Sequence, residues 1–110
     1  HPNIAEGGGP AMLAGAMVRP MEGVRGIFTA DQARAELGVR GTHTSRTAVI
    51  SVENTTNRGG GKCWPTENLA DLRALCDERG IAFHMDGARL MNAVIASGLS
   101  ARDYGSYVDT

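Results

Sequence analysis

Two apolar runs on either side of one predicted helix constrain the fold of this 110-residue chain more than any other feature. TAVISVE (47–53) is β-branched and almost wholly apolar, which is typical of a strand buried on both faces. IAFHM (81–85) predicts a second strand. The order of strand, helix and strand favours parallel pairing through a right-handed crossover. We therefore expect an α/β fold, with a mostly parallel sheet and flanking helices.

The helix between the two strands has clear signals at both ends. Pro65 and Thr66 begin it, and Gly80 is placed to end it. GARLMNAVIAS (87–97) predicts a further helix that ends at Gly98. Apolar residues recur at helical spacing in the first of these helices: Leu69, Leu72, Leu75 and Cys76.

Two segments before the first strand also carry local signals. Thr29 and Gln32 have capping-box spacing, which predicts a helix from Thr29 to about Leu37. AMLAGAMV (11–18) is a run of small and apolar residues that would allow close packing against a neighbour. No internal repeat or low-complexity linker interrupts the chain, so we expect a single domain or part of one.

Composition narrows the class of protein. A net charge of −1, with 42% hydrophobic and 21% charged residues, is typical of a soluble globular protein and argues against nucleic acid or an anionic membrane as partner. The apolar runs are too short to span a bilayer. Cys63 and Cys76 are too few for a zinc ribbon or a disulfide scaffold, so we interpret them as free thiols in a reducing, cytoplasmic compartment. His1 in place of Met, and a final VDT that looks like the start of a strand, suggest a fragment of a longer protein.

The stretch HMDGAR (84–89) is the strongest candidate for a site. Asp86 follows an apolar strand, where an unpaired carboxylate is costly to bury, so it needs a cationic partner. Arg89 in the first turn of the next helix is one candidate, as a purely structural ion pair, and a cation of a bound ligand is the other. Glu53 ends the preceding strand, at the same edge if the strands pair in parallel. Open α/β sheets bind ligands at this edge.

Lys62 is the only lysine among the 11 Lys and Arg residues. Its loop, NTTNRGGGK (54–62), ends in Gly-Lys but lacks the first glycine and the Ser or Thr of a phosphate-binding P-loop. A lysine that forms a Schiff base needs an apolar pocket or a neighbouring cation. Three glycines and a helix start indicate an exposed loop instead.

The three histidines allow several interpretations. His84 and Asp86 share one face of a strand, and with His43 they would make an incomplete zinc site, because nothing else nearby is a suitable ligand. We therefore expect no metal, and interpret His84 as a buried histidine hydrogen-bonded beside Asp86. His1 and His43 have no informative spacing by themselves, and surface histidines of this kind are usually solvated.

Three motifs in order resemble the low-specificity threonine aldolases: HPNIAEGGGPAMLAGAMVRP (1–20), ISVENTTNRGGGKCWP (50–65) and FHMDGARLMNA (83–93). These enzymes belong to the β-eliminating lyase group of fold-type I pyridoxal phosphate (PLP) enzymes. The resemblance covers essentially the whole chain and implies that residues 1–110 are the central portion of one large PLP-binding domain. One position departs from the pattern, because that family usually has a histidine where this chain has Thr56.

The resemblance implies a role for each candidate residue. Asp86 should pair with the protonated pyridine nitrogen of PLP, and Arg89 should reach the substrate α-carboxylate or the phenolic oxygen of the cofactor. His1 resembles the histidine that stacks on the pyridine ring, and His43 one that lies near the substrate hydroxyl. Either is a candidate for the base that removes the hydroxyl proton. The Schiff-base lysine is not in this chain and is expected about ten residues beyond Thr110.

The implied reaction is the cleavage of L-threonine, L-allo-threonine and related β-hydroxy-α-amino acids to glycine and an aldehyde. The partners implied are a small amino-acid substrate and a homotetramer, with no nucleic acid and no membrane. The chain alone is expected to be inactive, because it holds neither the covalent lysine nor the phosphate-binding turn. Two alternatives stay open: another fold-type I PLP enzyme, such as a β-eliminating lyase or an aminotransferase, and a non-catalytic fragment.

Overall fold

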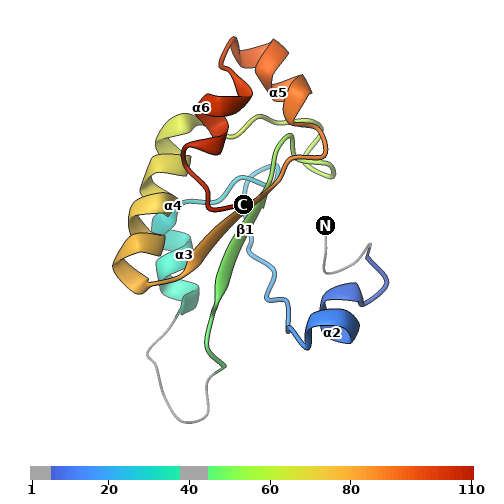
Figure 1. Cartoon of the computed structure of the whole chain (residues 1–110), viewed down its shortest axis with the longest axis vertical. Coiled ribbons are helices and arrows are strands. Elements are labelled where there is room, and N and C mark those ends of the chain that lie inside the picture. The colour runs from blue at the N-terminus through green and yellow to red at the C-terminus, as the bar shows by residue number, and fades with distance from the viewer. Residues whose placement is uncertain (1–5, 38–44) are drawn as a thin grey trace.

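A pair of parallel strands lies at the centre of the computed structural model, which describes residues 6–37 and 45–110 (Figure 1). Strand β1 (Val49–Glu53) and strand β2 (Ala82–Asp86) pair in register from Val49 opposite Ala82 to Glu53 opposite Asp86. The predicted parallel pairing and α/β class are therefore confirmed. The first strand begins two residues later than predicted, and the second is shifted by one residue so that it includes Asp86.

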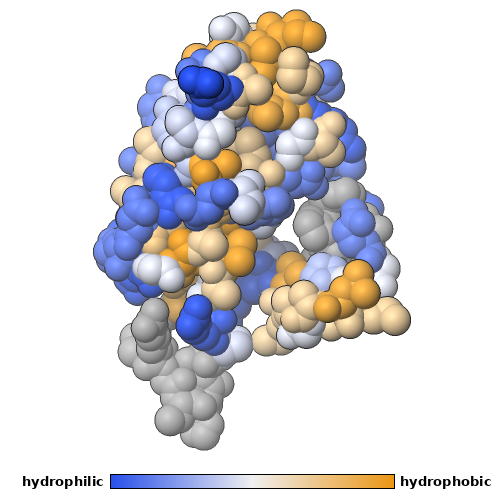
Figure 2. All heavy atoms as spheres, viewed as in Figure 1, coloured by the Kyte–Doolittle hydropathy of each residue, from blue (hydrophilic) through white to orange (hydrophobic). Residues whose placement is uncertain are grey.

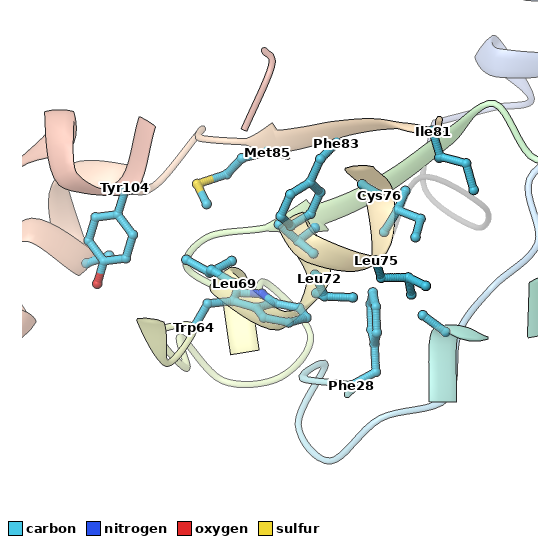
Figure 3. Close-up of a cluster of buried hydrophobic side chains, with 14 residues drawn as sticks. Phe28, Trp64, Leu69, Leu72, Leu75, Cys76, Ile81, Phe83, Met85 and Tyr104 are labelled. Atoms are coloured by element: carbon cyan, nitrogen blue, oxygen red, sulfur yellow. The ribbon is translucent and has the colours of Figure 1, made fainter. Parts of the chain in front are cut away.

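One face of this sheet carries the hydrophobic core. Helix α3 (Ala30–Leu37) packs on helix α4 (Thr66–Arg79), and α4 packs on β2. Figure 3 shows Phe83 projecting from β2 toward the leucines of α4. Trp64 contacts Phe28 edge-on, with ring centroids 5.1 Å apart. The predicted helical stripe of α4 is confirmed, because Leu69, Leu72, Leu75 and Cys76 are all buried.

The prediction that β1 is buried on both faces is wrong for the part of the chain that the structure describes. Ile50 and Val52 are buried, whereas Val49 is 50% exposed and Ser51 is also exposed. Successive side chains of a strand point to opposite faces, and α3 and α4 cover only one of them. The apolar composition of the strand therefore does not indicate that the described residues leave one of its faces uncovered.

The helix ends follow the local signals with one exception. The Thr29 hydroxyl accepts the Gln32 N–H at 3.2 Å, and the Gln32 side chain accepts the Thr29 N–H at 2.8 Å, so the capping box is confirmed. Gly80 ends α4 with a left-handed φ of 62°, which a glycine adopts without strain. Helix α5 (Leu90–Ser97) begins three residues later than predicted, so Arg89 occupies its N-cap position instead of its first turn.

Helix α6 (Ala101–Gly105) was not predicted, although Ser100 and Asp103 form a complete capping box at its start. After it, the chain returns to β2 on the edge opposite β1. The Asp109 N–H donates to the Phe83 carbonyl at 2.9 Å, and the Met85 N–H donates to the Thr110 carbonyl at 2.9 Å. Residues 109–110 thus lie against β2 as the predicted strand start would, but they are not a regular strand.

The N-terminal part of the described chain stands apart from the core. Helix α2 (Gly9–Ala14) has no buried residue, and Met12 and Leu13 are 87% and 86% exposed. Figure 2 shows this apolar surface as an orange area over α2. The predicted close packing of the 11–18 run against a neighbour stays a prediction. Among the described residues, no helix is both long and apolar enough to cross a membrane.

Candidate functional site

The carboxyl ends of the two strands bring Glu53 and Asp86 side by side. The two residues are register partners, and the Asn54 N–H donates to the Asp86 carbonyl at 3.0 Å. Both side chains lie on the sheet face opposite Ile50, Val52 and Phe83, and both are half-buried. The prediction that two strand-end carboxylates share one edge is therefore confirmed.

Asp86 has one oxygen committed to the local backbone. Its Oδ1 accepts the Ala88 N–H at 3.0 Å, which closes the turn between β2 and α5. Within residues 6–37 and 45–110, no basic side chain forms an ion pair with Asp86, and no donor reaches Oδ2. The structural ion pair between Arg89 and Asp86 that was one of the two predicted alternatives is therefore not formed.

Arg89 pairs with Glu53 instead. Its Nη1 lies 2.9 Å from Glu53 Oε1, and the side chains of Arg89 and Glu53 are 37% and 15% exposed. Glu53 Oε2 accepts the Asn57 N–H at 3.0 Å, so both oxygens of this carboxylate are engaged. In the described structure, Nη1 is the only guanidinium nitrogen of Arg89 with an acceptor, and the other N–H donors are available to a ligand.

The loop after β1 is unusually buried for a polar segment. Asn54, Thr55 and Thr56 are all less than 5% exposed. Asn54 Oδ1 accepts the Trp64 N–H at 3.4 Å, and Trp64 Nε1 donates to the Glu53 carbonyl at 3.1 Å. These bonds hold the end of β1 against the core.

Thr56, which departs from the family pattern, has a definite structural role. Its hydroxyl accepts the Lys62 N–H at 3.1 Å, and its methyl group lies against Gly26, where an added Cβ would come within 3.0 Å. Gly59 is closer still, because an added Cβ there would overlap the Arg25 carbonyl. Lys62 is exposed on this loop, as predicted.

The prediction for His84 is confirmed in part. The residue is hydrogen-bonded, with its Nδ1 2.8 Å from the Thr110 hydroxyl, but it is half-buried and not buried. No group of three or more metal-ligating side chains occurs in the described ranges. His1 and His43 lie outside the described residues, so their predicted roles are not placed.

The remaining candidates lie away from the strand ends. Cys63 and Cys76 are unpaired, as predicted, and burial raises the pKa of the Cys76 thiol, which makes it a packing residue. A groove of about 520 Å³ lies between residues 24–32 and residues 62–68. Lys62 is the one candidate residue that lines it, so this groove is separate from the Asp86 edge.

Sequence reasoning missed the ion pair between Arg89 and Glu53. The sequence predicts that both residues lie near the strand ends, but it offers Asp86 as the ion-pair partner of Arg89. The register of the two strands puts Glu53 beside Asp86, and no spacing along the sequence shows which of the two carboxylates Arg89 binds.

Comparison with known proteins gives the family. The family model described as beta-eliminating lyase matches residues 1–110. A low specificity L-threonine aldolase of Escherichia coli O157:H7 is 34% identical over 111 residues, covering 100% of this chain and 32% of that protein. A low-specificity L-threonine aldolase of Candida albicans is 36% identical over 114 residues, covering 100% of this chain and 30% of that protein.

A relative with a different named activity matches almost as well. The alanine racemase TOXG of Cochliobolus carbonum is 31% identical over 106 residues, covering 94% of this chain and 26% of that protein. The chain thus spans about a third or less of the length of these relatives, and their names include two reactions. By the match of the family model over the whole sequence, this chain belongs to the beta-eliminating lyase family.

Proposed function

We propose that this chain is the central part of the cofactor-binding domain of a fold-type I, PLP-dependent aldolase. The whole protein would cleave L-threonine, L-allo-threonine and related β-hydroxy-α-amino acids to glycine and an aldehyde. The observation that carries the proposal is the Asp86 carboxylate at the end of β2. It is half-buried, it has one oxygen without a donor, and no described cation pairs with it.

Asp86 suits the pyridine nitrogen of PLP for a physical reason. A half-buried carboxylate is stabilised by a cationic N–H partner, and its negative charge in turn favours the protonated form of that nitrogen. The bond between Asp86 Oδ1 and the Ala88 N–H fixes the orientation of the carboxylate before any ligand binds. When bound, PLP supplies an electron sink for the cleavage of the Cα–Cβ bond.

Arg89 is proposed to bind the amino-acid carboxylate or the phenolic oxygen of the cofactor. One nitrogen of its guanidinium is held by Glu53, and the described structure gives the remaining donors no acceptor. A planar fork of donors matches a carboxylate in two-point contact. Arg89 is more than one-third exposed, so a small ligand would have access to it.

The two histidines complete the proposal from the family pattern. His1 would stack on the pyridine ring, and His43 would lie near the substrate hydroxyl. Either of them, directly or through water, would accept the hydroxyl proton as the aldehyde leaves. Both assignments rest on the motifs that contain these residues.

The remaining features of the proposal concern the rest of the protein. Lys62 is exposed in a glycine-rich loop, which does not offer the apolar surroundings that a reactive amine needs, so the covalent lysine is proposed to lie outside this chain. The chain by itself would then be inactive. A cytoplasmic homotetramer that takes a small amino acid as substrate is likewise part of the proposal.

Product analysis tests the proposed reaction. The full-length protein that contains this chain, loaded with PLP and given L-threonine, should release acetaldehyde and glycine in equal amounts. Ammonia with an oxo acid would instead indicate an eliminating lyase of the same family. Interconversion of L- and D-alanine without cleavage of threonine would favour the racemase activity for which one relative is named.

Borohydride reduction of the PLP-loaded protein, followed by peptide mapping, tests the position of the lysine. The label should appear outside residues 1–110. Label on Lys62 would contradict the proposed arrangement of the site.

A further inference from the structure

We propose that Glu53 is a positioning residue, which holds Arg89 ready for the amino-acid carboxylate and away from Asp86. The inference rests on the proposed function and deepens it. It starts from the strand register, which makes Glu53 and Asp86 neighbours at the same edge. Among the described residues, Arg89 is the cation that forms an ion pair at these two adjacent carboxylates, and it binds Glu53.

Glu53 is itself firmly held. Its side chain is 15% exposed, and its Oε2 accepts the Asn57 N–H at 3.0 Å. Its carbonyl accepts the Trp64 indole N–H at 3.1 Å, which ties the end of β1 to a buried aromatic ring. The carboxylate therefore has a fixed position from which Oε1 binds Arg89 at 2.9 Å.

Holding Arg89 in advance has an energetic consequence. Arginine loses considerable rotamer freedom when a ligand immobilises it, and a side chain that is already ordered loses less. The pair with Glu53 orders Arg89 through Nη1 and leaves its other donors without acceptors in the described structure. We therefore expect Glu53 to strengthen binding of an α-carboxylate that it does not itself contact.

Keeping Arg89 from Asp86 has a second consequence. The two carboxylates are register neighbours, so an Arg89 released from Glu53 would find the uncommitted oxygen of Asp86 as its next acceptor. That contact would compete with the pyridine nitrogen of the cofactor. Loss of the Glu53 charge should therefore weaken both the binding of the amino acid and the retention of PLP.

The test uses Glu53→Gln in the full-length, PLP-loaded protein. Glycine is titrated while the cofactor absorbance is followed, and PLP retention is measured by dialysis. We expect glycine to bind about tenfold more weakly than in wild type, with faster loss of PLP, because a neutral acceptor holds a guanidinium less strongly. Glu78→Gln is the matched control, because Glu78 also binds an arginine, Arg34, at 2.8 Å, but on the outer surface of the helices. It should change neither quantity.

A double variant separates positioning from general loss of structure. If Glu53 acts through Arg89, then Glu53→Gln should weaken glycine binding much less in an Arg89→Lys background than in wild type. Additive losses would overturn the inference. The inference would also be overturned if Glu53→Gln kept glycine affinity and PLP retention within twofold of wild type while Arg89→Lys bound glycine more weakly.

Two further outcomes keep the inference distinct from the proposed function. If Glu53→Gln does not fold, Glu53→Asp replaces it in the same test, because aspartate keeps the charge but places the carboxylate at a different distance from Arg89. Unchanged glycine binding in that variant would again overturn the inference. If the wild-type protein does not bind PLP, the proposed function and this inference fall together. Normal threonine cleavage with an unimpaired Glu53→Gln would overturn the inference alone.

Discussion

The two faces of the β1–β2 sheet differ in what they carry. On one face, Ile50, Val52 and Phe83 are buried beneath the helices. On the other face, Val49 and Ser51 are exposed, and the carboxylates of Glu53 and Asp86 are only half-buried. The first face supplies stability within this chain, and the second presents the groups assigned to chemistry. Substitutions on the core face should therefore change the stability of the protein, and substitutions on the other face should change ligand binding and turnover.

The largest effect is expected on the core face. Leu72 is fully buried in α4, so Leu72→Ala removes packing and leaves a cavity. We expect the full-length protein to lose about 2–5 kcal/mol of unfolding free energy, measured by denaturant titration. Turnover per folded molecule should stay near that of wild type. A large loss of turnover per folded molecule, alongside the loss of stability, would show that the two faces do not contribute independently to stability and to catalysis.

Asp86→Asn tests the opposite face. The substitution keeps the size and an oxygen for the Ala88 N–H but removes the charge that would pair with the pyridine nitrogen. We expect threonine cleavage to fall roughly 100-fold or more, the equivalent of one lost charge-assisted hydrogen bond at the reacting ring, with weaker retention of PLP. The melting temperature without cofactor should change little. Activity within a few-fold of wild type would remove Asp86 from the proposed site.

Arg89→Lys is expected to have a smaller effect on the same face. Lysine keeps the positive charge and can still reach a carboxylate, but it lacks the planar fork. We expect KM for threonine to rise about tenfold with a smaller change in kcat. Steady-state kinetics over a series of β-hydroxy-α-amino acids measure both. If neither parameter changes, Arg89 serves only as the ion-pair partner of Glu53.

The sequence predicted the core face better than the open one, for reasons that particular residues make clear. The capping box of Thr29 and Gln32 and the αL position of Gly80 are local signals, so the bounds of α3 and α4 were nearly right. Helix α5 began late because Asp86 accepts the Ala88 N–H and draws that segment into a turn. Asp86 could be identified as a candidate, because a charge at the end of an apolar strand is unusual.

The sequence could not show in the same way which of the two carboxylates forms an ion pair with Arg89. That pairing depends on the register of strands that are more than thirty residues apart in the chain, Glu53 opposite Asp86. The burial of β1 on one face only could not be predicted for a similar reason. An apolar strand has the same composition whether or not a second layer of structure packs on its other face. Helix α6, by contrast, has a local signal in the sequence, because Ser100 and Asp103 have capping-box spacing.

The smallest effect is expected on the outer surface of the helical layer, where Arg34 of α3 binds Glu78 of α4 at 2.8 Å. Hydrogen bonds from Arg34 and Arg79 lower the pKa of Glu78 from 4.5 to about 2. A carboxylate whose pKa is lower in the folded than in the unfolded protein stabilises the fold at pH values above its unfolded-state pKa. This contribution is lost as the pH falls toward the folded-state pKa. Glu78→Gln should therefore cost a little stability near neutral pH. The difference from wild type should shrink between about pH 4.5 and about pH 2.

Thermal unfolding across this pH range, at low and high salt, measures that difference. Both partners are exposed to solvent, so added salt should reduce the difference further, and threonine cleavage should not respond to the substitution. A difference that grows as pH falls would contradict the assigned pair, because protonation would then be removing a repulsion and not an attraction. A change in KM would show that the helical layer and the strand-end carboxylates are coupled, and that the separation between the two faces of the sheet does not hold.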